Sequence, residues 1–93
     1  MNKKKLLIAR NKIDQLDKEI FYIIKKRTAI VKYMLSLKGF KKQIIDHKRI
    51  KEILKKIKKQ SIKNRIDPKI TSKIWKSMIW SYVDFQRRNF IKK

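Results

Sequence analysis

The longest pattern in the chain is a recurrence of apolar side chains every three or four residues from Leu6 to Leu37. This spacing is typical of one face of an α-helix, and neither Pro nor Gly interrupts it before Gly39. We therefore predict one helix of about 30 residues, about 45–50 Å long. Its apolar positions are Ile13, Leu16, Ile20, Ile23, Ile30 and Met34.

A second helix is predicted after a loop from Gly39 to Ile45, with Gly39 as the stop of the first helix. Asp46 is a good helix cap, because its side chain can accept a hydrogen bond from a free backbone N–H of the first turn. The helix that follows Asp46 is expected to end between Gln60 and Asn64. Its apolar positions are Ile50, Ile53, Leu54 and Ile57.

A third helix is predicted from Lys69 to about Phe90. Asp67 and Pro68 precede it, with Asp at the cap and Pro at the first helical position, which is a strong start signal. The apolar spacing continues through this segment. Its members are Ile70, Ile74, Trp75, Met78, Ile79, Tyr82 and Phe85.

The three predicted helices make an all-α chain, and we interpret residues 1–93 as a single domain. The first helix is longer than the diameter of a compact domain of this size. Two shorter helices cannot cover it along its whole length. We therefore expect a second copy of the chain to pack against it in a homodimer.

The net charge of +22 is the strongest feature of the composition and is compatible with a helical nucleic-acid-binding module. However, 23 of the 29 basic residues are Lys, and Ile is the commonest apolar residue. An A/T-rich genome favours the same bias, and the lysines are spread around the helices rather than gathered in one stripe. We favour this second interpretation and expect only nonspecific binding of nucleic acid.

The chain contains no Cys, which excludes a disulfide framework. The apolar run Leu6–Ala9 is too short for the core of a signal peptide, and no later stretch approaches the length of a membrane span. We therefore expect a cytoplasmic protein that does not enter a membrane.

Polar residues on the apolar stripes are the candidates for chemistry. Arg27 stands where the first helix needs its next core residue, and a buried arginine requires an anionic partner. Lys38 follows eleven residues later, which is three helical turns, so both side chains are expected on nearly the same side about 16 Å apart. Two long cations at that separation suit a small dianion between them. Arg49 follows Asp46 by three positions, and Gln86 places an amide on the apolar face of the third helix. A surface ion pair of Asp46 and Arg49 and a boundary position for Gln86 are the simpler alternatives.

The order of these residues resembles that of the AroQ-type chorismate mutases over essentially the whole chain. The matching positions are Arg10, Ile13, Asp14, Asp17, Lys26, Arg27, Lys38, Asp46, Arg49 and Gln86. The resemblance implies an intertwined homodimer in which the long first helices pair. It also implies that Arg10 enters the pocket of the partner chain. Arg10 lies about 25 Å along the helix from Arg27, so one chain cannot bring both to one small ligand.

Two positions depart from the ordinary mutase pattern. Ile50 stands where mutases carry a glutamate that accepts a hydrogen bond from the C4 hydroxyl of chorismate, and Tyr82 replaces a small hydroxyl residue. Both departures resemble the isochorismate-pyruvate lyases of salicylate biosynthesis, whereas Asp46 is a mutase-like feature. We favour a lyase with mutase side activity, with a dedicated chorismate mutase as the alternative.

The resemblance assigns a role to each candidate residue. Lys38 and Gln86 are expected to be catalytic, through donation to the ether oxygen whose bond to carbon breaks. The residues expected to bind the dicarboxylate substrate or to line its pocket are Arg10, Arg27, Asp46, Arg49, Ile50, Tyr82 and Val83. Both reactions are pericyclic, so we expect no metal and no cofactor.

Overall fold

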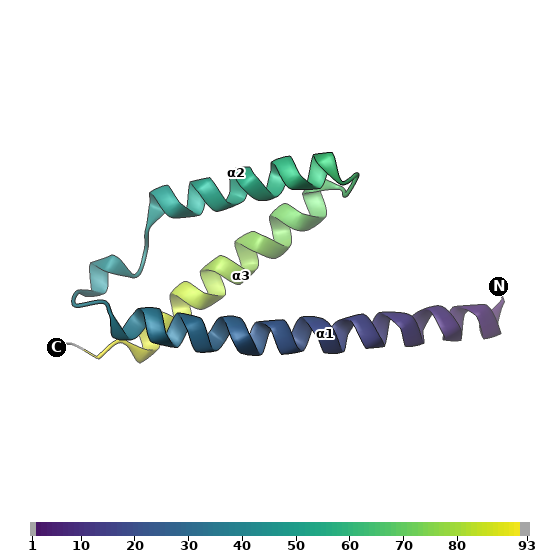
Figure 1. Ribbon diagram of the computed structural model, residues 1–93, viewed down its shortest axis with the longest axis horizontal. Helices are drawn as coiled ribbons and strands as arrows, with labels where there is room; N and C mark the ends of the chain where they lie inside the picture. The colour runs from purple at the N-terminus through teal and green to yellow at the C-terminus, as the bar shows by residue number, and fades with distance from the viewer. Residues whose placement is uncertain (1, 92–93) are drawn as a thin grey trace. The chain divides into compact units, whose positions relative to one another are not determined.

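The computed structural model describes residues 2–91 and contains helices and no strand in that part of the chain. The α-helices are α1 (Lys3–Ser36), α2 (His47–Lys63) and α3 (Pro68–Asn89), and a one-turn 3-10 helix, η1 (Lys41–Gln43), lies between α1 and α2 (Figure 1). The prediction of an all-α chain with a very long first helix is confirmed.

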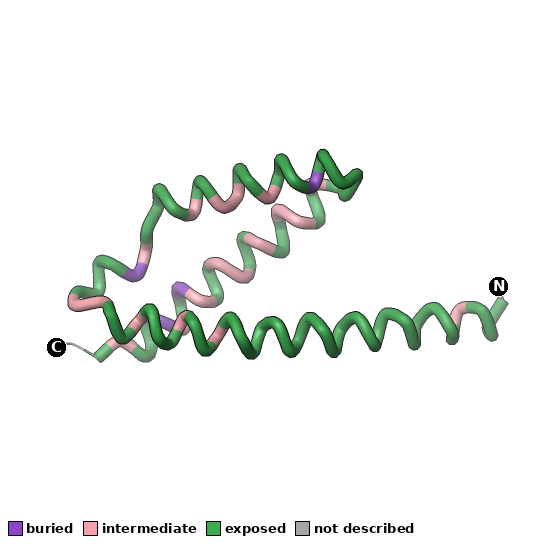
Figure 2. Tube along the Cα trace, viewed as in Figure 1, coloured by how far each residue is buried: buried purple, intermediate pink, exposed green. Residues whose placement is uncertain are grey.

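The chain divides into a first unit that ends at Val31 and a second that begins at Lys32. The first unit is helical from Lys3 onward, and none of its described residues is buried (Figure 2). Ile13, Leu16 and Ile20 are each more than half exposed. The apolar stripe predicted from the sequence is therefore present as an exposed surface of α1.

In the second unit α2 packs against α3, and both are visible as neighbours in Figure 1. Ser61 is 3% exposed and links the two helices, because its Oγ lies 2.7 Å from Thr71 Oγ1 and also donates to the Ile57 carbonyl at 2.6 Å. The buried apolar side chains are Ile44 and Val83. This small core fixes the two helices that carry most of the candidate site.

The starts of α2 and α3 are capped as predicted. Asp46 Oδ1 accepts the Arg49 N–H at 3.0 Å, and Asp67 Oδ1 accepts the Lys69 N–H at 2.9 Å, with Pro68 as the first residue of α3. Each carboxylate satisfies an N–H that has no partner within its helix. Because these signals depend only on neighbouring residues, the sequence was sufficient to place both starts.

The segment after α1 differs from the prediction. The helix ends at Ser36, and the N–H groups of Leu37 and Lys38 donate to the carbonyls three residues earlier, which tightens the last turn. Gly39 does not adopt a positive φ, so it is not the helix stop that we expected. Lys38 lies beyond the helix, so the eleven-residue spacing from Arg27 to Lys38 is not helical throughout.

The predicted loop from Gly39 to Ile45 is also wrong in part, because residues 41–43 form η1. Ile44, directly after this turn, is 4% exposed and belongs to the core. A buried residue inside a short lysine-rich segment has no periodic signal in the sequence. None of the described helices has the length and apolar content that a membrane span requires.

Candidate active site

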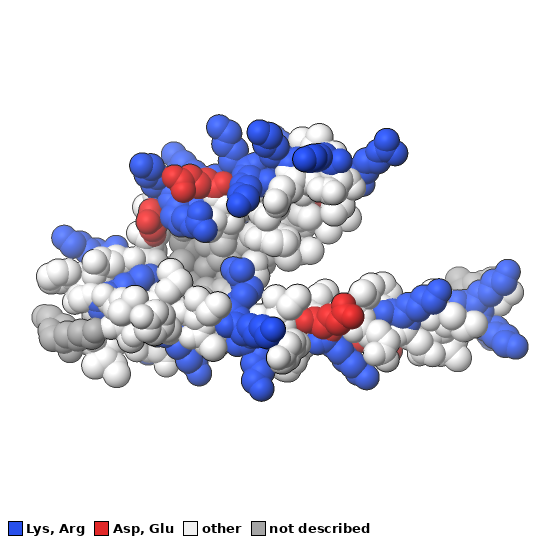
Figure 3. Space-filling model, in the orientation of Figure 1, with Lys and Arg blue, Asp and Glu red and all other residues white. Residues whose placement is uncertain are grey.

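Lys38 has an environment that differs from that of the other cations. Among the described residues, every other Lys and every Arg is exposed, whereas Lys38 is half-buried. Figure 3 shows the exposed basic side chains along α1 and α2. Long cationic side chains normally keep their charge in water, so a Lys withdrawn from solvent requires a polar partner.

Gln86 is that partner. Lys38 Nζ donates to Gln86 Oε1 at 2.7 Å, and Gln86 Nε2 donates to the Tyr82 carbonyl at 3.2 Å. An ammonium group can only donate, so the amide oxygen faces Lys38 and the amide nitrogen faces the carbonyl. Gln86 is 8% exposed, and its orientation is set from both sides. The Lys38 ammonium and the Gln86 amide, from distant parts of the sequence, therefore meet at one place.

Asp46 adds a negative charge near this pair. Burial lowers the pKa of Lys38 below its usual value of 10.5, and the charge of Asp46 partly offsets that by raising it. The same carboxylate caps α2 through one oxygen, Oδ1. Asp46 is thus both the cap of α2 and the carboxylate whose charge raises the pKa of Lys38.

The predicted wall residues lie on α2 and α3. Val83 is 5% exposed, and Ile50 and Tyr82 are half-buried. Tyr82 also contributes the carbonyl that orients Gln86. The structure therefore places these apolar side chains on α2 and on α3, the helix that also carries Gln86, while their contact with a substrate stays a prediction.

The three arginines predicted to bind the dicarboxylate substrate are all exposed. Arg10 and Arg27 are exposed residues of the first unit. Arg49 is exposed, and its guanidinium lies 3.9 Å from Glu52, so the alternative of an ion pair with Asp46 is not what the structure contains. Asp46 instead accepts the backbone N–H of Arg49. That these arginines bind the carboxylates of the substrate stays a prediction.

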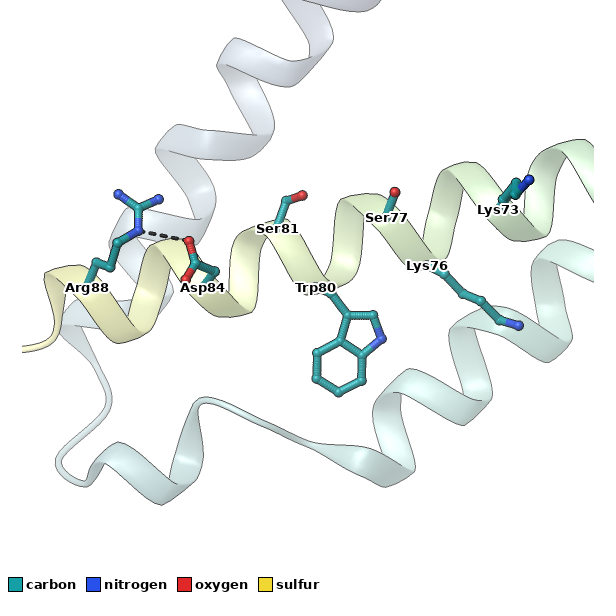
Figure 4. A pocket seen from close by; sticks show the side chains of 7 residues that line it. All are labelled: Lys73, Lys76, Ser77, Trp80, Ser81, Asp84 and Arg88. Carbon is teal, nitrogen blue, oxygen red and sulfur yellow. Dashed lines mark hydrogen bonds and ion pairs between the residues drawn. The ribbon is translucent and has the colours of Figure 1, made fainter.

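A separate pocket of about 720 Å³ follows one face of α3 and includes none of the predicted site residues (Figure 4). A single helix supplies its whole lining, and an ion pair between Arg88 and Asp84 at 2.8 Å lies at one end. Its lining residues are Lys73, Lys76, Ser77, Trp80, Ser81, Asp84 and Arg88. The Lys38–Gln86 pair, in which Gln86 is buried and Lys38 half-buried, is the better candidate for catalysis, because catalytic donors must be withdrawn from water.

Sequence reasoning missed Gln43. Its side-chain Oε1 accepts the N–H groups of Gly39 and Phe40, both at 2.8 Å, directly after Lys38. The spacing of three residues from Phe40 to Gln43 is that of a helix-capping glutamine, which reaches back to the residue before its helix. That spacing was the available signal, but the segment had been interpreted as a loop.

Comparison with known proteins identifies the chemistry for which this arrangement is suited. The model of the family Chorismate mutase type II matches residues 9–87, which is most of the chain. The chain belongs to the chorismate mutase type II family. Searches of curated proteins and of solved structures gave no match.

Membership of this family makes the chain a pericyclic enzyme of the chorismate mutase type, acting on a chorismate-type substrate. Such a substrate carries two carboxylates and an ether oxygen. The Lys38–Gln86 pair offers hydrogen-bond donors, since one bond uses only one of the three N–H groups of the ammonium. A chemistry that requires donors rather than a nucleophile fits these residues.

Proposed function

We propose that the enzyme converts chorismate to prephenate. The observation that supports this proposal is Asp46, a carboxylate that caps α2 and whose charge raises the pKa of Lys38. Ile50 cannot accept a hydrogen bond from the C4 hydroxyl of chorismate. Asp46 uses Oδ1 for the helix cap and has a second oxygen that can take this role.

An isochorismate-pyruvate lyase is the second candidate function. The half-buried Ile50 on α2 favours it, because isochorismate carries its hydroxyl at C2 and needs no acceptor at this wall. Tyr82 favours it through the resemblance described above. Leaving a substrate hydroxyl without a partner costs about 1–3 kcal/mol, so this wall can discriminate between the two substrates.

In both reactions the bond between the ring carbon and the ether oxygen breaks while the CH₂ carbon of the enolpyruvyl group gains a new bond. The new bond joins a ring carbon in the mutase reaction and a transferred ring hydrogen in the lyase reaction. Negative charge develops on the ether oxygen as the C–O bond lengthens. Lys38 and Gln86 would donate hydrogen bonds to that oxygen and stabilise it most in the transition state.

The remaining part of the proposal is a homodimer in which Arg10 enters the partner's site. The exposed apolar stripe of α1 supports it, since a helix with no buried residue needs a further packing surface. Arg27 and Arg49 complete the carboxylate clamp in this proposal. Arginine suits that role because its planar guanidinium binds carboxylates in a bidentate way.

A side-by-side assay of chorismate and isochorismate tests the proposal. The expected result is a higher kcat/KM for the conversion of chorismate to prephenate than for the release of salicylate and pyruvate. The reverse ranking would establish the lyase. The variant Ile50→Glu should raise kcat/KM for chorismate relative to isochorismate, because it adds an acceptor at a wall position that Ile50 leaves apolar. Binding of duplex nucleic acid without turnover of either substrate would contradict both functions.

A further inference from the structure

The amide of Gln43 binds the backbone that directly follows Lys38. Its Oε1 accepts two consecutive N–H groups, from Gly39 and Phe40, each at 2.8 Å. A carbonyl oxygen has two lone pairs and can accept both. Within η1 the Gln43 N–H donates to the Phe40 carbonyl at 3.0 Å and the Ile44 N–H donates to the Lys41 carbonyl at 3.1 Å. The earlier N–H groups precede that turn, and the Gln43 side chain satisfies them.

These hydrogen bonds restrict the backbone of Lys38 from one side. The Gly39 N–H belongs to the rigid peptide plane that also contains the Lys38 carbonyl, so fixing the N–H fixes that plane. On the other side, the Lys38 N–H donates to the Leu35 carbonyl at 3.1 Å. The Cα of Lys38 is therefore held between the end of α1 and the Gln43 amide.

The Gln43 side chain is itself held in place by the core. Ile44 follows Gln43 directly and is 4% exposed, whereas Gln43 is exposed. The buried Ile44 keeps η1 in place, and the Gln43 side chain extends from η1 back to the segment that carries Lys38. The arrangement thus connects the core to the Lys38–Gln86 hydrogen bond. The Gln43 side chain acts through the backbone in this arrangement, since the hydrogen bonds described above join it to N–H groups and not to the side chain of Lys38 or Gln86.

We propose that Gln43 is a positioning residue that keeps the ammonium of Lys38 against Gln86 by clamping the Gly39–Phe40 backbone. This inference rests on the proposed role of Lys38 as donor to the ether oxygen. A displacement of about 1 Å of a catalytic group can cost on the order of a hundredfold in rate. Lysine has a long flexible side chain, so a mobile backbone at its Cα would spread the positions of Nζ widely.

The test compares three variants with the wild type. Gln43→Ala removes the acceptor, Gln43→Glu keeps an oxygen that accepts both N–H groups, and Gln60→Ala removes an exposed glutamine side chain from α2 as the matched control. Gln43→Ala should lower kcat about tenfold or more with little change in KM, since the donor acts mainly in the transition state. Gln43→Glu should restore most of the rate, and Gln60→Ala should match the wild type.

A second readout does not depend on turnover. The pKa of the Lys38 ammonium, followed by NMR of its side chain, should rise toward 10.5 in Gln43→Ala, because a released Lys38 returns to water. The amide hydrogens of Gly39 and Phe40 should also exchange faster. In Gln60→Ala the pKa of Lys38 and the amide exchange rates should stay as in the wild type. Circular dichroism should show unchanged helix content in every variant.

The possible results distinguish a failure of the proposed function from a failure of the positioning role of Gln43. If the wild type converts neither chorismate nor isochorismate while Gln43→Ala still raises the pKa of Lys38, the proposed function fails and the positioning role stands. If the wild type is active and Gln43→Ala changes neither kcat nor the Lys38 pKa, the positioning role is overturned. A loss of rate that Gln43→Glu does not restore would also contradict it, because the acceptor oxygen would then be irrelevant.

Discussion

Lys38 combines a positive charge with partial burial, a combination that no other described Lys or Arg has. We predict that Lys38→Ala lowers kcat by about 100- to 1,000-fold, the usual cost of removing one donor to a developing oxyanion. Lys38 lies outside the helices, so the circular dichroism spectrum should not change. Lys41→Ala, in the same segment but exposed, is the control and should keep full activity.

Asp46 and Lys38 together make the activity depend on pH. The protonated Lys38 is the better donor, so the rate should fall as pH rises through the pKa of Lys38, which burial holds below 10.5. Asp46 raises that pKa, and its neutral replacement in Asp46→Asn should therefore move the fall in rate to lower pH. Asn caps helices as well as Asp, so the start of α2 should be preserved.

The measurement is kcat as a function of pH between neutral and alkaline conditions for wild type and Asp46→Asn. Glu52→Gln is the control, because it also removes a carboxylate from α2 and should leave the alkaline fall where it is. A fall that stays in place or moves to higher pH in Asp46→Asn would show that Asp46 does not act on Lys38. Any separate loss of substrate affinity in Asp46→Asn would appear in KM.

At the scale of single elements, the end of α2 stores strain at Arg65. This residue has φ 57°, and the Ile66 N–H donates to the Ser61 carbonyl at 2.8 Å, with the Arg65 N–H donating to the Ile62 carbonyl at 3.2 Å. This is the Schellman arrangement, in which glycine normally occupies the left-handed position. A residue with a side chain costs about 1–2 kcal/mol in that conformation.

We therefore predict that Arg65→Gly is more stable than Arg65→Ala by about 1 kcal/mol. Both variants remove the same charge, so the difference between their free energies of unfolding reports the cost of the left-handed backbone conformation. The larger conformational entropy of glycine in the unfolded chain reduces this difference. Urea unfolding followed by circular dichroism measures the free energy of unfolding. Equal stabilities of the two variants would show that the turn relaxes when the Arg side chain is removed.

The elements also show which parts of this fold a sequence can predict. Asp46 and Asp67 place the starts of α2 and α3, because a cap acts on N–H groups only two or three residues away. The buried position of Ile44 depends on packing against distant residues, so no local pattern indicates it. Gln43 had a local signal in its spacing from Phe40, but the lysines around it suggested a solvated loop.

The candidate site was predictable in a different way. Lys38 and Gln86 are 48 positions apart and form a 2.7 Å hydrogen bond, and their assignment to one site came from the resemblance to a family rather than from periodicity. The eleven-residue spacing from Arg27 to Lys38 is not helical throughout, because α1 ends at Ser36. Helical spacing predicts which face a residue occupies only as far as the helix continues.

For the whole molecule, the proposed homodimer would let Arg10 serve the site that contains Lys38 in the partner chain. We predict that two inactive variants, Arg10→Ala and Lys38→Ala, regain activity when they are mixed, unfolded and refolded together. In a dimer with sites built across the interface, a mixed dimer has one site with both defects and one site with neither. Random pairing at equal amounts should then recover about a quarter of the wild-type activity.

The alternative arrangement gives the opposite result. If Arg10 served the site of its own chain, every site in the mixture would carry one defect, and the refolded mixture would be as inactive as each variant alone. Refolded wild type measures the yield, and size-exclusion chromatography shows that dimers have formed. The exposed stripe of α1 supports the shared site, because pairing of the long helices would bury Ile13, Leu16 and Ile20 and carry Arg10 into the partner at the same time.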